Sequence, residues 1–214
     1  MSNTAVAAVE AVGRAVAENK EYLTELDAAI GDADHGINMA RGFDAVLRKL
    51  QTLAPEADLG TVLKTTAMTL ISTVGGASGP LYGTAFLRGS ATVQGQQSMD
   101  RETAVNLFAA AISGIKERGK AACGEKTMLD ALEPAYAAFA ANIAGQKSLA
   151  ECLEAACLAA QQGVEYTKTI IAAKGRASYL GERSLGHQDP GATSSYIMLN
   201  ALADYCRQHN LEVS

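Results

Sequence analysis

The sequence predicts an all-α protein, a single domain over residues 1–214 that forms an up-and-down bundle of eight antiparallel helices. Apolar side chains recur every three or four residues along almost the whole chain, as at Val9, Val12 and Val16, and no segment alternates with a period of two. Hydrophobic residues make up 48% of the chain, aromatic residues only 5%, and the sequence has no Trp. This composition favours close packing of Ala- and Leu-rich helices over strands.

Breaks at Gly, Pro and polar clusters set the expected boundaries of the helices. Pro80 suits the first turn of the fourth helix, and Ser148 with Glu151 forms a capping box at the start of the seventh. Gly175 suits the C-terminal stop of that seventh helix. The predicted helices cover residues 4–28, 36–50, 58–74, 80–94, 100–118, 127–142, 148–173 and 191–209.

Charge and composition exclude several classes of function. A net charge of −5 argues against nucleic acid or an anionic membrane as the main partner, because both require a basic face. The first twenty residues lack the basic start and uninterrupted apolar core of a signal peptide, and no apolar run approaches the ~20 residues of a membrane span. The four cysteines form no CxxC pair, which favours a reducing cytoplasm.

Three carboxylates lie close together where the first predicted helix meets the second. Asp27, Asp32 and Asp34 fall within eight positions around Gly31, and acids this close repel one another unless a cation compensates. Oxygen ligands without neighbouring Cys or His clusters suit Mg²⁺ or Ca²⁺. The alternative is a solvated loop in which Asp34 caps the next helix. The spacing does not fit an EF-hand, because Ile37 stands where its glycine should be.

The connections between predicted helices are of two kinds that alternate along the chain. Those after the second, fourth and sixth helices are short and chemically plain, whereas those after the first, third, fifth and seventh are polar and glycine-rich. Alternate junctions of an antiparallel bundle share one end. The four polar loops are therefore expected to meet there and form one site.

Two of these loops suit a phosphate group. The run GGASG at 75–79 leads into a helix start, where backbone N–H groups and the Ser78 hydroxyl can face an anion, although a plain turn is the alternative. The long segment 174–191 supplies Arg176 and Arg183, and Lys120 and Lys126 come from the connection after the fifth helix. Acid, metal and base together suit phosphoryl transfer, with Arg176 stabilising the charge in transit; a solvated basic loop is the alternative.

Two further residues near these loops have expected roles in the site. His35 follows Asp34 at a helix entrance and is expected to hydrogen bond to phosphate, and Met128 borders the fifth connection, where it can pack on a flat base.

Four motifs in these loops resemble the nucleotide-binding L subunit of bacterial dihydroxyacetone kinases. They are GDADHGINM at 31–39, GGASGPL at 75–81, GK at 119–120 with KTM at 126–128, and the whole of 174–191. The resemblance implies a barrel of eight antiparallel helices with a nucleotide and Mg²⁺ at one end. It also implies Mg²⁺ ligands at Asp27, Asp32 and Asp34, and tightly bound ADP in contact with His35, Gly36, Ile37, Asn38, Ala77, Ser78, Gly119, Met128, Arg176, Asp189, Pro190 and Gly191.

The resemblance further implies an activity that needs partner subunits. In the phosphotransferase-system-dependent form, a phosphohistidine M subunit rephosphorylates the bound ADP, and the phosphoryl group passes to dihydroxyacetone on a K subunit. The sequence shows no substrate domain ahead of this one, which favours that form over the L domain of an ATP-dependent triose or tetrose kinase. A metal-dependent hydrolase or a non-catalytic nucleotide sensor would also be compatible with clustered aspartates beside a phosphate-binding loop.

Overall fold

The computed structural model describes residues 3–213, and over that range every regular element is a helix, as the sequence predicts. No described helix is long and apolar enough to cross a membrane. The α-helices are α1 Thr4–Glu18, α2 Lys20–Ile30, α3 His35–Leu50, α4 Leu59–Thr73, α5 Ser78–Thr92, α6 Arg101–Gly119, α7 Leu129–Ala144, α8 Leu149–Tyr166 and α9 Pro190–Gln208; the 3₁₀ segments are η1 Thr167–Thr169 and η2 Arg176–Ser184.

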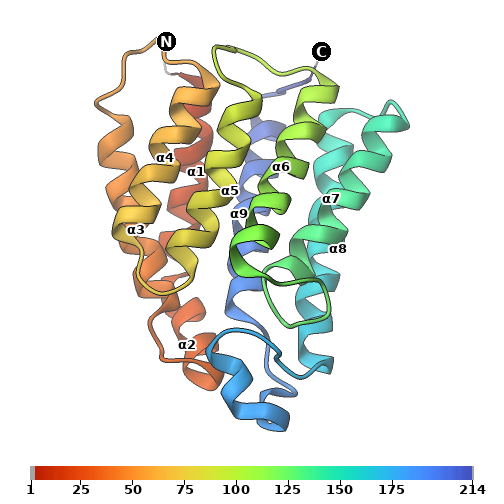
Figure 1. The fold of residues 1–214 in the computed structure, drawn as a ribbon. Coiled ribbons are helices and arrows are strands. Elements are labelled where there is room, and N and C mark those ends of the chain that lie inside the picture. The colour runs from red at the N-terminus through yellow and green to blue at the C-terminus, as the bar shows by residue number, and fades with distance from the viewer. Residues whose placement is uncertain (1–2, 214) are drawn as a thin grey trace.

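Eight long helices of the described chain form a closed ring, which confirms the antiparallel up-and-down fold. Each of α3 to α8 packs against the next helix along the chain, while α1 packs against both α3 and α9 and so closes the ring. Neighbouring helices run in opposite directions, and both termini lie at the same end (Figure 1). The short α2 lies outside this ring, at the opposite end, together with η2.

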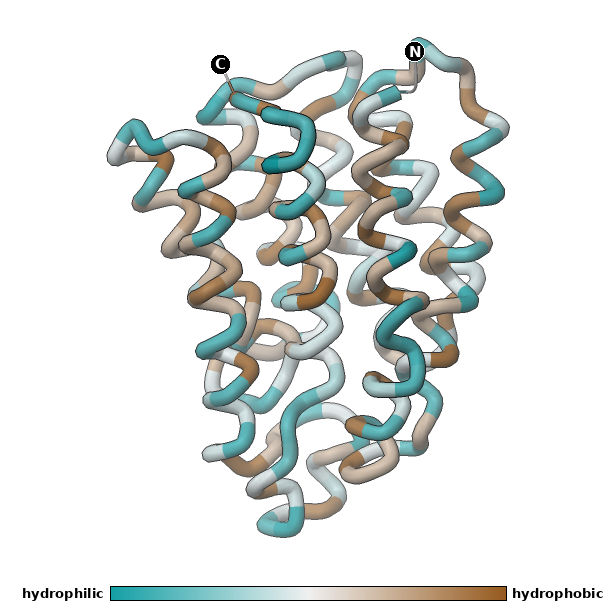
Figure 2. Tube along the Cα trace, turned by 180° about the vertical axis from the view of Figure 1, so that it is seen from behind, coloured by the Kyte–Doolittle hydropathy of each residue, from teal (hydrophilic) through white to brown (hydrophobic). Residues whose placement is uncertain are grey.

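Amphipathic helices with small residues at their contacts explain this packing. Hydrophobic and hydrophilic residues are mixed along the helices (Figure 2), and the buried side chains include Phe43, Leu70 and Leu129. The contact between α7 and α8 is so close that a Cβ at Gly163 would lie 2.0 Å from the backbone oxygen of Asp130. The interior also keeps an apolar cavity of about 300 Å³.

The first predicted helix, 4–28, is wrong in one respect, because it is two helices that meet at Asn19. The Asn19 side chain donates to the carbonyl of Ala15 at 2.8 Å, a local bond that competes with continuation of the helix. After this break α2 packs against α3, α9 and η2. The turn brings the acidic residues at the end of α2 to the lower end of the barrel (Figure 1).

The seventh predicted helix, 148–173, begins with the expected capping box at Ser148 but ends early, at Tyr166. Two side chains take the place of the continuing helix, that of the distant Lys126 and that of Thr167, which directly follows Tyr166. The Lys126 ammonium donates to the carbonyls of Thr167 and Ile170, and the Thr167 hydroxyl accepts from the backbone N–H of Asp189 at 3.0 Å. Gly175 therefore does not stop this helix; it precedes η2 in the segment 170–189, which we call the strap.

Candidate functional site

The four polar loops meet at one end of the barrel and enclose a cavity of about 450 Å³. Its walls include Asp32 from the first loop, Ser78 from the second, Gly119 from the third and Arg176 from the strap. The prediction that alternate junctions share one end is therefore confirmed. A cavity of this size is in the range of small-molecule and cofactor sites.

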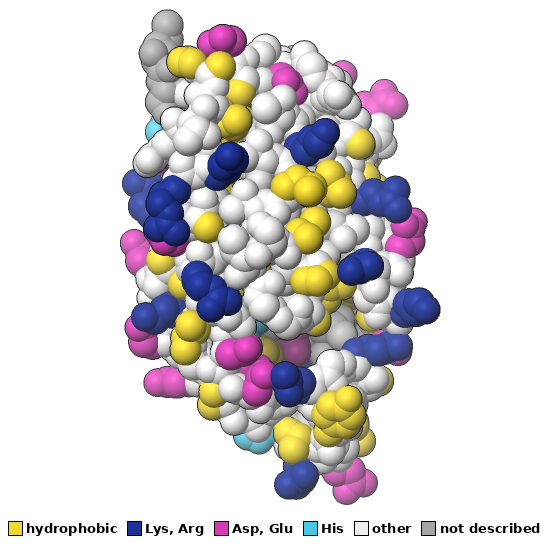
Figure 3. Space-filling view, turned by 60° about the vertical axis from the view of Figure 1, so that its left-hand side comes forward, with side chains coloured by type: hydrophobic (Ala, Val, Ile, Leu, Met, Phe, Trp, Pro, Cys, Tyr) yellow, Lys and Arg dark blue, Asp and Glu magenta, His cyan; other side chains and the backbone are white. Residues whose placement is uncertain are grey.

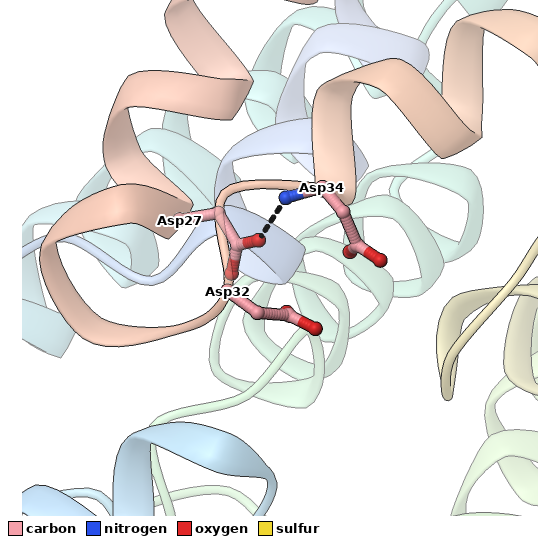
Figure 4. A group of neighbouring side chains, drawn as sticks. All are labelled: Asp27, Asp32 and Asp34. Atoms are coloured by element: carbon pink, nitrogen blue, oxygen red, sulfur yellow. Dashed lines mark hydrogen bonds between the residues drawn. The ribbon is translucent and has the colours of Figure 1, made fainter.

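The three aspartates converge on one point. Asp27 comes from the last turn of α2, Asp32 from the loop, and Asp34 from the residue before α3 (Figure 4). One carboxylate oxygen from each lies within 4.8 Å of the others. An all-oxygen donor set of this kind fits Mg²⁺ or Ca²⁺ better than Zn²⁺.

The Asp27 carboxylate is held by backbone N–H groups at the start of α3. Its Oδ2 accepts from the backbone N–H groups of Asp34 at 2.8 Å and His35 at 3.1 Å, so the buried carboxylate of one helix caps the start of another. Asp34 occupies the N-cap position of α3 but its side chain makes no capping bond, so the interpretation of Asp34 as a helix cap is wrong. Gly31 is needed here, since a Cβ would lie 2.0 Å from Oδ1 of Asp27.

Arg176 provides positive charge to this acidic group. Its Nη2 lies 2.8 Å from Oδ2 of Asp32, and both side chains are partly exposed. Acidic side chains and a basic one gather at the edge of a hollow in the lower part of the molecule (Figure 3). The arrangement places a guanidinium, which is always charged, beside the point where the three carboxylates meet.

The glycine-rich loop forms the wall beside the carboxylates. Gly76 has a φ of +65°, which glycine adopts without strain, and α5 then begins at Ser78, two residues before the predicted start at 80. Ala77 stands at the N-cap position without a side-chain capping bond. Free N–H groups at the start of a helix are suited to bind an anion.

His35 lies behind this loop. Its Nδ1 is 3.0 Å from Oγ of Ser78 and its Nε2 is 2.9 Å from Oγ of Ser194 on α9. Burial lowers the pKa of His35, although the charges of Asp27 and Asp34 act in the opposite direction. Both ring nitrogens therefore have hydroxyl partners, so the direct bond from His35 to phosphate that the sequence predicts would require one of these hydrogen bonds to break.

Lys126 is not the free positive charge expected from the sequence. It is 1% exposed, has a φ of 60°, and donates to the carbonyl of Thr167, just before the strap, and to that of His187, near the other end of the strap. Burial lowers its pKa, while the charges of Asp189 and Asp130 raise it. Lys126 therefore joins the third polar loop to the strap that carries Arg176.

Asp189 begins α9 beneath this lysine. Its Oδ2 accepts from the backbone N–H of Ala192 at 2.7 Å. Burial raises the pKa of Asp189 to about 7, against the lowering effects of that hydrogen bond and of the Lys126 charge. The carboxyl group thus stands at the boundary between its neutral and charged forms near neutral pH.

Most of the residues expected to bind the nucleotide line the cavity, and two do not. A Cβ on Gly36 would lie 2.0 Å from the carbonyl oxygen of Lys20, so Gly36 packs against α2, and the side chain of Ile37 is 48% exposed on the first turn of α3. Neither is part of the wall. The expected residues that do line the cavity are His35, Asn38, Ala77, Ser78, Gly119, Met128, Arg176, Asp189, Pro190 and Gly191.

Some wall residues were given no individual role from the sequence, although Leu81 and Lys174 lie within the quoted motifs. Leu81, Ile115 and Leu129 form an apolar side next to Met128, and Arg118 and Lys174 add positive charge. The apolar residues lie at helical spacing, which marks a core position as readily as a binding site. Only the arrangement of the loops around these residues shows that they line a cavity and are not ordinary core positions.

The sequence of this chain matches a known protein family and several of its members. The family described as the DAK2 domain matches residues 29–204. The ADP-binding subunit DhaL of the PEP-dependent dihydroxyacetone kinase of Escherichia coli (strain K12) is 50% identical over 183 residues, which cover 86% of this chain and 87% of that subunit. The ADP-binding subunit DhaL of kinase 1 of Listeria innocua is 49% identical over 190 residues, 89% of each chain.

A solved structure extends the likeness to three dimensions. The dihydroxyacetone kinase from C. freundii in complex with AMP-PNP and Mg²⁺ matches with a TM-score of 0.71 and 28% sequence identity. The match covers 95% of this chain and 34% of that kinase, so this chain spans about a third of its length. From the family match over residues 29–204 and the identity to DhaL subunits over most of both chains, this chain belongs to the DAK2 domain family.

Proposed function

We propose that this chain is the Mg-ADP-carrying subunit of a PEP-dependent dihydroxyacetone kinase. One observation carries the proposal: three carboxylates, a glycine-rich helix start and Arg176 from the strap border the same cavity. Acidic ligands for a metal, N–H groups for phosphate and a guanidinium for the transferred charge are the components that phosphoryl transfer requires.

Asp27, Asp32 and Asp34 would hold the metal ion. The ion would supply positive charge that offsets the charge on the phosphate oxygens. Asp27 is buried and fixed by two backbone N–H groups, whereas Asp32 is exposed and paired with Arg176. We infer that Asp32 gives up its ion pair with Arg176 when the metal ion binds, since one carboxylate oxygen cannot bind a guanidinium and a metal ion equally well.

The remaining walls divide between phosphate and base. The start of α5, with Ala77 and Ser78, faces the aspartates and suits the diphosphate, while the apolar side around Met128 suits the flat adenine ring. Asp189, Pro190 and Gly191 would complete the base side from the start of α9. In this arrangement the three aspartates, through the metal ion that they hold, would fix the position of the phosphate groups.

We propose further that turnover needs partners, with an M-type phosphohistidine subunit as donor and a K subunit that holds dihydroxyacetone. Arg176 is the catalytic residue in this account, because its guanidinium is exposed at the mouth of the cavity. A partner that covers this mouth would exclude the water that competes for the phosphoryl group. We place the activity in the cytoplasm, with ADP kept tightly bound between cycles.

Reconstitution tests the proposal. The protein is mixed with the K subunit and the phosphorylated M subunit of a related kinase and with dihydroxyacetone, and dihydroxyacetone phosphate is measured. We expect product only with all subunits present, no product from Asp32→Ala, and normal product from Asp44→Ala, whose exposed carboxylate pairs with Arg48 on α3. Phosphate release by the isolated protein would favour a hydrolase, and ADP binding without product would favour a nucleotide sensor.

A simpler observation comes first. The chain contains seven Tyr and no Trp, so its own ultraviolet absorbance is weak. Gel-filtered protein that retains ADP should therefore show a spectrum dominated by adenine, and a spectrum typical of tyrosine alone would count against tight retention.

A further inference from the structure

A row of hydrogen bonds leads from the interior of the barrel to the glycine-rich loop. Tyr82 Oη on α5 lies 2.7 Å from Oγ of Ser194 on α9, and Ser194 lies 2.9 Å from Nε2 of His35. The other ring nitrogen, Nδ1, lies 3.0 Å from Oγ of Ser78 at the cavity wall. Tyr82, Ser194 and His35 are 3%, 0% and 7% exposed, so water does not compete for these bonds.

The position of one proton in this row decides what Ser78 can offer to a ligand. A neutral imidazole has one N–H donor and one acceptor nitrogen. If the proton is on Nδ1, the ring donates to Ser78 Oγ and the Ser78 hydroxyl proton is free to point into the cavity. If it is on Nε2, Ser78 has to donate to Nδ1 and can offer only lone pairs, which repel a phosphate oxygen.

The surroundings of Ser194 favour the first arrangement. The Gly191 carbonyl has two possible donors besides Ser194, which lies 3.1 Å from it: Ser195 Oγ at 2.9 Å and the Tyr82 hydroxyl at 3.0 Å. It therefore keeps a partner without Ser194, and the Tyr82 hydroxyl remains available to it when Ser195 is replaced. The Ser194 hydroxyl is therefore free to donate to Nε2 of His35. In the Nδ1–H form Nε2 is a buried acceptor, and donation from Ser194 keeps it paired, since an unpaired buried acceptor costs free energy.

We propose that Ser194 is a positioning residue: its hydroxyl holds His35 in the Nδ1–H form, which leaves the Ser78 hydroxyl proton for a phosphate oxygen of a nucleoside diphosphate. The ligand in this inference rests on the proposed function. The assignment of the proton does not, because it concerns side chains of the chain itself and is measurable without nucleotide.

Ser195 provides a matched control. Both serines are buried, both lie within hydrogen-bonding distance of the Gly191 carbonyl and of Tyr82, and they differ in that Ser194 contacts His35. Ser194→Ala and Ser195→Ala therefore remove the same atom from neighbouring positions, and only the first interrupts the row. A folding defect common to both variants is visible in their unfolding midpoints.

The first test is ¹⁵N nuclear magnetic resonance of the imidazole groups. The chain has three histidines, so His187→Gln and His209→Gln suffice to assign His35. We expect the Nδ1–H form in wild-type protein and Ser195→Ala, with and without Mg-ADP, and loss of that preference in Ser194→Ala. The Nε2–H form in wild-type protein, or equal shifts in both serine variants, would overturn the inference.

The second test is titration with ADP in the presence of Mg²⁺. We expect Ser194→Ala to weaken binding about tenfold, as for loss of one hydrogen bond to a charged group, and Ser195→Ala to change it less than about twofold. In a Ser78→Ala background, Ser194→Ala should cause no further loss, because the two act through one bond. Additive losses would overturn the inference. Wild-type protein with the Nδ1–H form but no affinity for ADP would refute the proposed function and leave the assignment of Ser194 standing.

Discussion

The two ends of the barrel begin their helices in different ways. At the end with plain loops, α1, α4, α6 and α8 each start with a side chain that accepts from its own first turn: Asn3, Asp58, Asp100 and Ser148. At the opposite end, α3, α5 and α7 start at Asp34, Ala77 and Met128 without such a bond, and α9 alone of the described helices starting there is capped by its own residue, Asp189.

The capped end contributes mainly to stability, and the other end provides the groups that can bind a ligand. Local caps close the plain end with residues three positions apart, and each contributes about 1 kcal/mol. At the site end, the start of α3 is instead satisfied from a distance by Asp27, and the start of α5 has no side-chain cap and faces the cavity. Open N–H groups and convergent carboxylates stabilise the folded chain less but are available to a ligand and its metal.

The largest expected effect comes from Asp27→Ala, which removes the distant cap and one carboxylate together. We expect Mg-ADP binding to weaken by at least about 100-fold, since outer partners of a metal already contribute 10–100-fold, and unfolding free energy to fall by about 2 kcal/mol as buried N–H groups lose their partner. Asp58→Ala at the plain end is the control, with a lower melting temperature and unchanged binding. Equal losses of binding in both variants would abolish the distinction between the ends.

Lys126→Met tests how the strap is held. Removal of the ammonium leaves carbonyls of Thr167 and His187 unpaired and Asp189 without its countercharge, so we expect a loss of about 3 kcal/mol in urea unfolding. Lys120→Met, in the same loop but exposed, should cost less than about 0.5 kcal/mol. A stable Lys126→Met protein with full affinity for ADP would mean that the strap is positioned by different contacts.

The pH dependence of stability tests Asp189. Its pKa is about 7 in the folded chain against an ordinary value of 3.8, so the folded chain binds more protons and Asp189 makes stability fall as pH rises from about 4 to 7. Asp189→Asn should remove this part of the slope, making the variant gain at least about 1 kcal/mol relative to wild type between pH 5 and 8. If the unfolding free energies of the two proteins, measured with urea, changed with pH in parallel, a raised pKa of Asp189 would be contradicted.

The smallest effect is expected at the plain end. Ser148→Ala removes the capping box of α8 and should lower the unfolding free energy by about 1 kcal/mol without changing ADP affinity. Thermal unfolding and calorimetric titration measure the two quantities. A loss of affinity here would show that the ends are coupled through the helices.

Local sequence signals predicted much of this molecule. The period of the apolar residues gave the all-helical fold, the alternation of loop chemistry placed the site at one end, and the spacing of Asp27, Asp32 and Asp34 identified the acidic group that the structure brings within 4.8 Å. These features depend on residues close in sequence or on the simple geometry of an antiparallel bundle.

What the sequence did not predict depends on contacts between distant residues. The early end of α8 requires Lys126, more than 40 positions away, and the partners of His35 include Ser194, 159 positions away. Buried hydroxyls such as Tyr82 and Ser194 resemble ordinary core residues until their partners are known. No local sequence pattern predicts which distant residue supplies the hydrogen bond that ends α8 or pairs with His35.

A crystal structure of the protein with ADP and Mn²⁺, in which anomalous scattering locates the metal, tests the central claim most directly. The account predicts a metal ion held by Asp27, Asp32 and Asp34, with the diphosphate between it and the start of α5 at Ser78. A diphosphate bound at the capped end of the barrel, or a metal ion that touches none of the three aspartates, would contradict it.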